Sequence, residues 1–253
     1  MHLQSMKLNK DIFHKLNSKT GQIAVLIDPE ETNSKEKLQE IVEKAEFAMV
    51  NYFFVGGSTV TREDFNKTTS ILKQLTTIPM VIFPGDHQQL SNDADALLYL
   101  SLLSGRNPEY LIGQHVKSAQ EVMQLEIEVI PTAYILIDGG NQSTVAYVSQ
   151  TTPIPRDKIA IALNTAIAGV LQGKKVVYFD AGSGAKNPVE SQLITQVNHQ
   201  LNTVTIVGGG VRSIEQIEDL KNAGTNVIVI GNKIEEDIDF LLDIQNYKSK
   251  SLL

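Results

Sequence analysis

The chain has 253 residues, a formal net charge of −7 and no cysteine; hydrophobic residues make up 42% of it and charged residues 20%. This composition excludes a fully disordered chain, and the acidic balance argues against nucleic-acid or anionic-membrane binding as the main activity. The absence of cysteine excludes disulfides, thiolate nucleophiles and cysteine-ligated zinc or iron–sulfur centres. A length of about 250 residues fits one (β/α)8 barrel.

The N-terminus lacks the apolar stretch of a secretory signal, and no apolar run reaches the roughly 18 residues of a membrane-spanning helix. We therefore expect a cytoplasmic protein without a transmembrane segment. No low-complexity or proline-rich linker divides the chain, so we interpret residues 1–253 as a single domain, with residues 1–10 as a flexible extension.

Short apolar runs typical of buried strands alternate with polar stretches that have helical periodicity. The predicted strands are residues 23–28, 47–55, 80–83, 96–102, 133–138, 175–180, 203–207 and 226–230. The predicted helices are 34–45 (with Ser34 as N-cap), 62–75, 158–171, 188–199 and 213–223. Regular alternation predicts a parallel sheet with right-handed crossovers, and eight units predict a closed α/β TIM barrel. A doubly wound open sheet is the alternative.

Two stretches give weaker signals. Residues 101–125 contain glycine, asparagine and proline at the start of a possible helix, so an irregular beginning is expected there. Residues 139–155 show no clear helix, and we expect a long loop over the face that carries the active site.

Glycines follow the predicted strands directly, at 56–57, 182–184, 208–210 and 231. In a barrel these positions lie at the carboxyl ends of the strands, where active sites are built. The loops after the last two strands commonly bind phosphate through backbone N–H groups, and glycine permits the close approach that such binding needs. Although glycine after a strand is also a common turn residue, three clusters in consecutive loops favour phosphate or diphosphate binding.

Polar side chains stand at the same predicted strand ends. Asp28 ends the first strand and suits a Mg²⁺ ligand, since magnesium prefers one or two carboxylates together with substrate phosphates and water. Asp138 and Asp180 end two later strands, and either is a candidate to bind a substrate hydroxyl or to act as a general base. Ser58 and Thr59 offer hydroxyl oxygens after the 56–57 turn. For each of these residues alone, a role in capping a turn is the competing interpretation.

Taken together, four segments resemble one family. The segments 26–30 (LIDPE), 178–185 (YFDAGSGA), 207–213 (VGGGVRS) and 229–232 (VIGN) are similar to those of the geranylgeranylglyceryl phosphate synthases and the related bacterial heptaprenylglyceryl phosphate synthases. Segments 99–108, 131–134 and 153–155 also look like this family, so the resemblance extends over nearly all of residues 23–232. The family consists of TIM-barrel prenyltransferases, and the 178–185 segment is its specific signature here.

The resemblance implies a Mg²⁺-dependent reaction that joins sn-glycerol 1-phosphate to a polyprenyl diphosphate, here geranylgeranyl diphosphate, as an ether and releases diphosphate. It assigns Asp28 and Ser58 to the metal and Asp180 and Tyr178 to catalysis. The residues implied to bind glycerol phosphate are Tyr178, Phe179, Asp180, Ala181, Gly182, Ser183 and Gly184 for the glycerol, and Gly209, Gly210, Gly231 and Asn232 for the phosphate. A homo-oligomer, either a dimer or a hexamer, is also implied.

The chain departs from the family pattern at two places. Asp180 stands where the family often has Glu, and the shorter side chain is expected to lengthen a contact to the glycerol hydroxyl. The bacterial homologues tend to have a lysine just before the first-strand aspartate, whereas this chain has the apolar residues 25–27 there. This second departure indicates the archaeal-like branch of the family.

An apolar prenyl chain would require an apolar groove, for which the candidates are Tyr99, Leu102, Leu103, Tyr134 and Ile135, although each taken singly is more typical of a core. Release of a lipid product predicts a transient contact with a membrane. Two other functions remain open at this stage. One is an isomerase or synthase acting on a phosphorylated sugar-like substrate, and the other is a non-catalytic binder of a phosphorylated ligand on the same scaffold.

Overall fold

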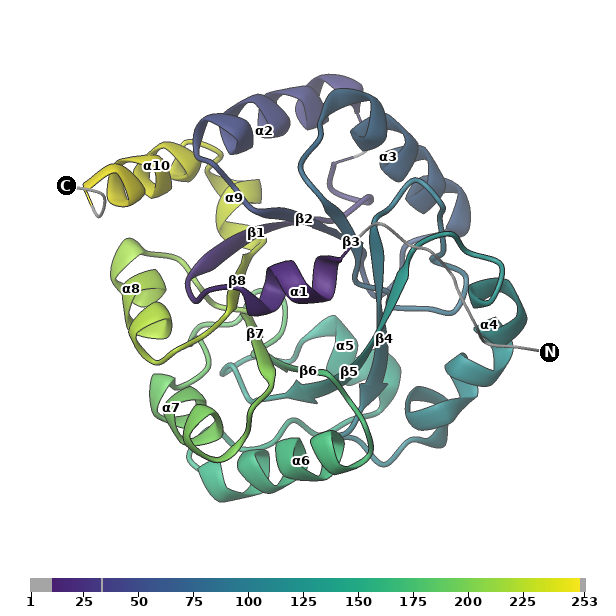
Figure 1. Cartoon of the computed structure of the whole chain (residues 1–253), viewed down its shortest axis with the longest axis vertical. Helices are drawn as coiled ribbons and strands as arrows, with labels where there is room; N and C mark the ends of the chain where they lie inside the picture. Colours follow the sequence, from purple (N-terminus) through teal and green to yellow (C-terminus); the bar gives the residue numbers. More distant parts are fainter. Residues whose placement is uncertain (1–10, 33, 251–253) are drawn as a thin grey trace.

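The computed structural model describes residues 11–32 and 34–250, and in it eight parallel strands close into a barrel in the order β1 to β8 (Figure 1). The flexible extension predicted for residues 1–10 lies outside the described residues. The strands are β1 Gln22–Ile27, β2 Tyr52–Val55, β3 Met80–Ile82, β4 Ala96–Leu102, β5 Glu128–Leu136, β6 Val176–Asp180, β7 Val204–Gly208 and β8 Val227–Ile230. The predicted TIM barrel is confirmed, and the open sheet is excluded because β1 pairs with β8.

Helices form a ring outside the barrel (Figure 1). The larger ones are α2 Lys35–Phe47, α3 Arg62–Leu75, α4 Gln114–Val122, α6 Ile159–Leu171, α7 Ser191–Gln200, α8 Ile214–Asn222 and α10 Phe240–Lys250. The shorter ones are α1 Ile12–Asn17, α5 Thr144–Ser149, α9 Asn232–Glu236 and the π-helix η1 Glu109–Gly113. Ser34 caps α2 as predicted, because its side chain accepts a hydrogen bond from the Lys37 N–H.

The alternation of side chains along each strand produces two apolar layers. One set of side chains fills the interior of the barrel, as Ala24 and Phe54 do. The other set, which includes Val25 and Phe53, packs between the strands and the surrounding helices. Because both faces of every strand are covered, the strands appear in the sequence as nearly continuous apolar runs. Figure 1 shows α1 lying across one end of the barrel, where the buried Ile12 and Leu16 close the interior.

The second strand is shorter than its apolar run predicted. Residues 47–55 were expected to be one strand, but α2 continues through Phe47 and β2 begins only at Tyr52. Between them Met49 turns the chain with a φ of 50°, and its backbone N–H bonds to the carbonyl of Glu46. Apolar residues at the end of an amphipathic helix and in a following buried strand are indistinguishable by composition, which explains the error.

The connections differ around the barrel. Residues 83–95, between β3 and β4, form no helix, so this crossover is a loop. The expected irregular start within 101–125 is present as η1, which runs directly into α4. The loop expected at 139–155 contains a short helix, α5, capped by the side chain of Ser143. None of the helices in the described ranges is both long and apolar enough to cross a membrane.

Candidate active site

A cavity of about 290 Å³ opens at the carboxyl ends of the barrel strands. All eight strands or the loops that follow them contribute to it, as the barrel architecture dictates. Of the residues predicted for the site, those that line this cavity are Asp28, Ser58, Tyr178, Asp180, Ser183, Gly209, Gly210, Gly231 and Asn232. The structure therefore brings both the predicted metal ligands and the predicted phosphate ligands to one place.

The glycines after β7 allow the backbone to pass very close to the β6 loop. Gly209 and Gly210 have φ values of 80° and 71°, which L side chains rarely adopt. A Cβ on Gly209 would lie 2.7 Å from Asp180 Oδ1 and 2.7 Å from the amide nitrogen of Gly182. The absence of a side chain thus lets the Gly209 backbone pass against Asp180 and the Gly182 amide, where any larger residue would fill the space.

Asn232, the first residue of α9, ties the β6 loop to the β8 loop. Its Oδ1 accepts hydrogen bonds from the Gly184 N–H at 2.7 Å and from the Ser183 hydroxyl at 3.1 Å, while its Nδ2 donates to Glu235. Asn232 therefore fixes the positions of two glycine-containing loops relative to each other. Residues of both loops line the cavity, so their relative position shapes the space in which an anion would bind.

Asp180 is the central polar side chain on the floor of the cavity. It is only 7% exposed, and it accepts hydrogen bonds from the Tyr134 hydroxyl at 2.5 Å and from the Gly182 N–H at 2.8 Å. Burial raises the pKa of Asp180, while these two hydrogen bonds act in the opposite direction because they favour the carboxylate. A carboxylate with a raised pKa and a fixed orientation suits a general base.

Two tyrosines accompany this carboxylate. Tyr178 stands two residues before Asp180 on β6, and Tyr134 reaches it from β5. Burial, followed by the neighbouring Asp180 charge, raises the pKa of both tyrosines well above their usual value. Both hydroxyls therefore stay protonated at neutral pH, and the Tyr134 hydroxyl donates its hydrogen bond to Asp180.

Asp28 lies directly after β1, on the opposite side of the cavity. Its Oδ1 accepts a hydrogen bond from the Glu30 N–H at 3.0 Å, and its Oδ2 faces Gly57, where a Cβ would come within 2.7 Å. Burial raises the pKa of Asp28, against the opposing backbone hydrogen bond from Glu30. Within the described residues no cluster of three His, Asp or Glu side chains is close enough to hold a metal. One carboxylate and the Ser58 hydroxyl nevertheless match the sparse ligand set that Mg²⁺ takes when phosphates supply further oxygens.

Several predicted residues do not face the cavity. Phe179 on β6 and Ala181 just after it point away from the cavity. Both are buried in the layer between the sheet and the helices. Gly182 and Gly184 do not line the cavity; they shape the loop with φ values of 88° and 70°. Asp138, a candidate general base, is exposed and lies outside the cavity. Asp180, not Asp138, is therefore the strand-end carboxylate that is positioned for chemistry.

A second, mostly apolar cavity adjoins the first and shares Tyr134, Leu100 and Ser58 with it. It lies beside the loop 83–95 and β4, and residues of α4 and α5 complete its wall. Its apolar lining is Leu90, Leu97, Tyr99, Leu100, Leu102, Tyr110, Tyr134, Val145 and Val148. Among the groove residues proposed from the sequence, Tyr99, Leu102 and Tyr134 line it, whereas Leu103 and Ile135 belong to the layer beneath the helices.

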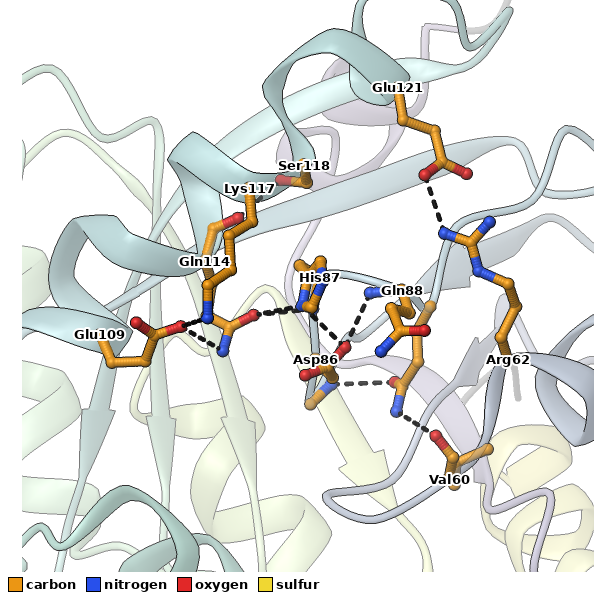
Figure 2. A network of polar contacts seen from close by, with 12 residues as sticks. Val60, Arg62, Asp86, His87, Gln88, Glu109, Gln114, Lys117, Ser118 and Glu121 are labelled. Atoms are coloured by element: carbon orange, nitrogen blue, oxygen red, sulfur yellow. Dashed lines mark hydrogen bonds and ion pairs between the residues drawn. The ribbon is translucent and has the colours of Figure 1, made fainter.

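Side-chain contacts hold the wall of this cavity in place (Figure 2). The Gln114 amide on α4 accepts a hydrogen bond from the His87 N–H at 2.9 Å and donates to Glu109, which also pairs with Lys117. Glu121, farther along α4, pairs with Arg62 of α3 at 2.8 Å. These contacts connect the loop after β3 to η1 and α4.

Some cavity residues were missed by sequence reasoning. Phe83 and Pro84 follow β3 and line the main cavity. Glu235 of α9 and Arg212 in the loop after β7 also line it. Phe83 ended a predicted strand and preceded a Pro–Gly pair, which is the same strand-end signal that selected Asp28. The hydrogen bond between Tyr134 and Asp180 left no such signal, because the two residues are 46 positions apart.

The model of the PcrB family matches residues 17–248 of the chain. The chain belongs to the PcrB family. It is 48% identical over 221 residues to a geranylgeranylglyceryl phosphate synthase of Chitinophaga pinensis, covering 87% of each chain, and 37% identical over 226 residues to that of Korarchaeum cryptofilum, covering 89% of this chain and 92% of the other.

The solved structures agree with this family assignment. The (S)-3-O-geranylgeranylglyceryl phosphate synthase of Thermoplasma acidophilum, in complex with sn-glycerol-1-phosphate, superposes with a TM-score of 0.86 at 32% identity, covering 95% of this chain and 96% of the other. A thiamine phosphate pyrophosphorylase of Pyrococcus furiosus superposes with a TM-score of 0.59 at 12% identity, which reflects the shared fold alone. The family resemblance inferred from segments 26–30, 178–185, 207–213 and 229–232 is thereby confirmed.

Proposed function

We propose that this chain is a prenyltransferase that joins sn-glycerol 1-phosphate to a polyprenyl diphosphate, of which geranylgeranyl diphosphate is the expected one. The observation that carries the proposal is the junction of two unlike cavities at Tyr134: one is lined by glycine loops and carboxylates, the other by apolar side chains. A phosphorylated alcohol suits the first, and the second, of about 80 Å³, suits the part of an apolar tail that lies next to it. The synthases to which the chain is similar support this assignment.

In this proposal the phosphate is bound by the loops around Gly209, Gly210, Gly231 and Asn232. The glycerol hydroxyl is directed at Asp180, whose orientation is held by Tyr134 and by the Gly182 N–H. The C1–O bond of the prenyl diphosphate breaks with its electron pair remaining on the diphosphate. The hydroxyl oxygen forms the new bond to C1, and its proton passes to Asp180. Fixing both partners in one cavity removes much of the entropic barrier.

We assign Mg²⁺ to Asp28, with the Ser58 hydroxyl as a second contact. The ion would neutralise the negative charge that develops on the leaving diphosphate. The chain's contribution is to place the Asp28 carboxylate at the rim of the cavity, backed by Gly57. Neighbouring Glu30 and Glu31 add negative charge near this carboxylate, and this charge also favours a bound cation.

The experiment incubates the purified chain with labelled sn-glycerol 1-phosphate, Mg²⁺ and prenyl diphosphates of several lengths, followed by analysis of the lipid extract. We expect a labelled ether lipid whose formation stops with a chelator and returns with Mg²⁺. sn-Glycerol 3-phosphate is the matched control and should react much more slowly. No labelled lipid with any prenyl length would refute the proposal.

We further propose that the chain forms a homo-oligomer through the outer face of α6. Residues 159–171 contain no charged side chain, and Ile161 and Leu171 on this helix are 52% and 82% exposed. Exposed apolar surface of this kind is typical of an interaction site. The double variant Ile161→Glu, Leu171→Glu should lower the molar mass measured by light scattering to that of a monomer. A cytoplasmic location, with transient membrane contact during product release, completes the proposal.

A further inference from the structure

Three aromatic rings meet inside the main cavity. The rings of Phe83 and Tyr178 are stacked, with centroids 4.8 Å apart and an interplanar angle of 21°. The ring of Tyr134 stands nearly perpendicular to both, 5.6 Å from each. They come from β5, β6 and the end of β3, and all three line the cavity. The three rings therefore pack against one another in the wall of the cavity.

This aromatic cluster is linked to both carboxylates of the site. Tyr134 donates to Asp180, and Tyr178 is two residues away from it. On the other side, the loop after Phe83 touches the backbone that supports Asp28: a Cβ on Gly85 would be 2.4 Å from the Gly57 carbonyl, and a Cβ on Gly57 would be 2.7 Å from Asp28. A reacting carbon between the diphosphate at Asp28 and the hydroxyl at Asp180 would therefore lie beside the rings.

The position of Phe83 is fixed by its backbone. Its N–H donates to the Val55 carbonyl at 2.9 Å, and its carbonyl lies so close to Gly56 that a Cβ there would be 1.9 Å away. The Gln89 side chain bridges the two loops, accepting from the Gly85 N–H and donating to the Gly57 carbonyl, both at 2.9 Å. A ring held in this way is already in place before the substrate binds.

Phe83 has no polar group, and the cavity includes apolar residues such as Leu26, Leu100 and Val229 that fill space equally well. What an aromatic ring adds is the negative electrostatic potential of its face, which attracts a cation. In the proposed reaction, positive charge develops on the allylic C1 as its bond to the diphosphate oxygen breaks.

We propose that Phe83 is a catalytic residue of the prenyl transfer: together with the rings of Tyr134 and Tyr178 it contacts the allylic C1 and stabilises the positive charge that develops there. Phe83 forms and breaks no bond and exchanges no proton. The inference rests on the proposed function, since only an allylic diphosphate that ionises would make use of such a ring.

The test replaces Phe83 by phenylalanines that carry one, two and three fluorine atoms on the ring. Fluorination preserves the shape of the ring and withdraws charge from its face in steps. We expect kcat to fall about threefold with each fluorine and about thirtyfold over the series, with little change in the KM for glycerol phosphate. Phe83→Leu should lie at the low end of the series.

Phe54 provides the matched control. It is a buried phenylalanine inside the same barrel, and it does not line either cavity. The same fluorinated residues at Phe54 should leave kcat unchanged. If kcat stays constant across the Phe83 series, or if the Phe54 series falls in parallel, the inference is wrong although the proposed function stands. A wild-type chain that forms no ether lipid would refute both together.

Discussion

The two ends of the active-site cavity are built in different ways. The end formed by β6, β7 and β8 consists largely of backbone: glycines with positive φ at 182, 184, 209 and 210, with the Asn232 side chain bonded to the β6 loop. The end formed by β1 to β4 consists of side chains: the carboxylate of Asp28 and an apolar cavity beside the loop 83–95, which forms no helix. The first end is held by hydrogen bonds to its backbone, and the second depends on the packing of side chains.

This difference indicates how the site divides its work. A phosphate has one shape and one charge, so a fixed set of backbone donors can recognise it. A prenyl chain has no polar group to direct it, so its position must come from the shape of an apolar surface, and Tyr134 joins the two ends. Substitutions at the backbone end should therefore affect glycerol phosphate, and those at the side-chain end should affect the prenyl diphosphate.

The largest effect is expected from Asp28→Ala, which removes the carboxylate of the proposed Mg²⁺ site. We expect kcat to fall by about a thousandfold or more, since the leaving diphosphate loses its counter-charge. Circular dichroism should show an intact fold, and titration with Mn²⁺ followed by paramagnetic resonance should show weaker metal binding. Asp138→Ala, at an exposed strand end outside the cavity, is the control and should retain activity. Near-normal turnover by the Asp28 variant would contradict the metal assignment.

The second effect is expected at the backbone end. In Gly209→Val a Cβ would clash with Asp180 Oδ1 and with the 181–182 amides, so the phosphate loop must move. We expect the KM for glycerol phosphate to rise about a hundredfold, while the KM for the prenyl diphosphate changes little. Steady-state kinetics with each substrate varied in turn measures both.

Gly173→Val is the control for Gly209→Val, because it separates the effect of backbone strain from the effect of a changed cavity. Gly173 also has a positive φ, 88°, but a Cβ there meets nothing within 4 Å, and the residue lies outside both cavities. This variant should lose stability without a change in either KM. Equal KM values for glycerol phosphate in the Gly209 variant and the wild type would show that this loop does not bind the phosphate.

The same difference between the two ends explains which parts of the fold and the site could be predicted from the sequence. The barrel and the glycine loops were predictable because a buried strand and a positive-φ turn each depend on the local sequence, as in residues 203–210. The apolar cavity was predicted only in part: Tyr99, Leu102 and Tyr134 were expected to line a groove and do so, whereas part of its wall is α5, which lies in a stretch expected to be a loop. Likewise the contact of Tyr134 with Asp180 depends on the pairing of β5 with β6, which no local pattern encodes.

Tyr134 stands at the junction of the two ends, and Tyr134→Phe tests its hydrogen bond to Asp180. This bond favours the carboxylate and so lowers the pKa of Asp180 against the effect of burial. Its loss should raise that pKa further, and the acid limb of the kcat/KM profile should move to higher pH. We expect kcat at neutral pH to fall about tenfold.

Tyr99→Phe is the control for this hydroxyl. The Tyr99 hydroxyl donates to the backbone carbonyl of His115 at 3.0 Å and does not contact Asp180. Its removal should leave the acid limb of the pH profile where it is. If the Tyr134 and Tyr99 variants give the same profile as the wild type, Asp180 is not the base whose ionisation limits the reaction.

The smallest effect is expected in the apolar cavity, from Val148→Thr. Val148 is a half-buried residue of α5 that lines the apolar cavity and not the main one, and the change replaces one methyl group by a hydroxyl of nearly equal size. Because the loss of about one buried methyl contact costs close to 1 kcal/mol, the KM for the prenyl diphosphate should rise about fivefold, and that for glycerol phosphate should stay the same. Val116→Thr, 70% exposed on α4, should alter neither. A rise in the glycerol phosphate KM instead would mean that the apolar cavity does not hold the prenyl chain and that the two ends are not separate binding sites.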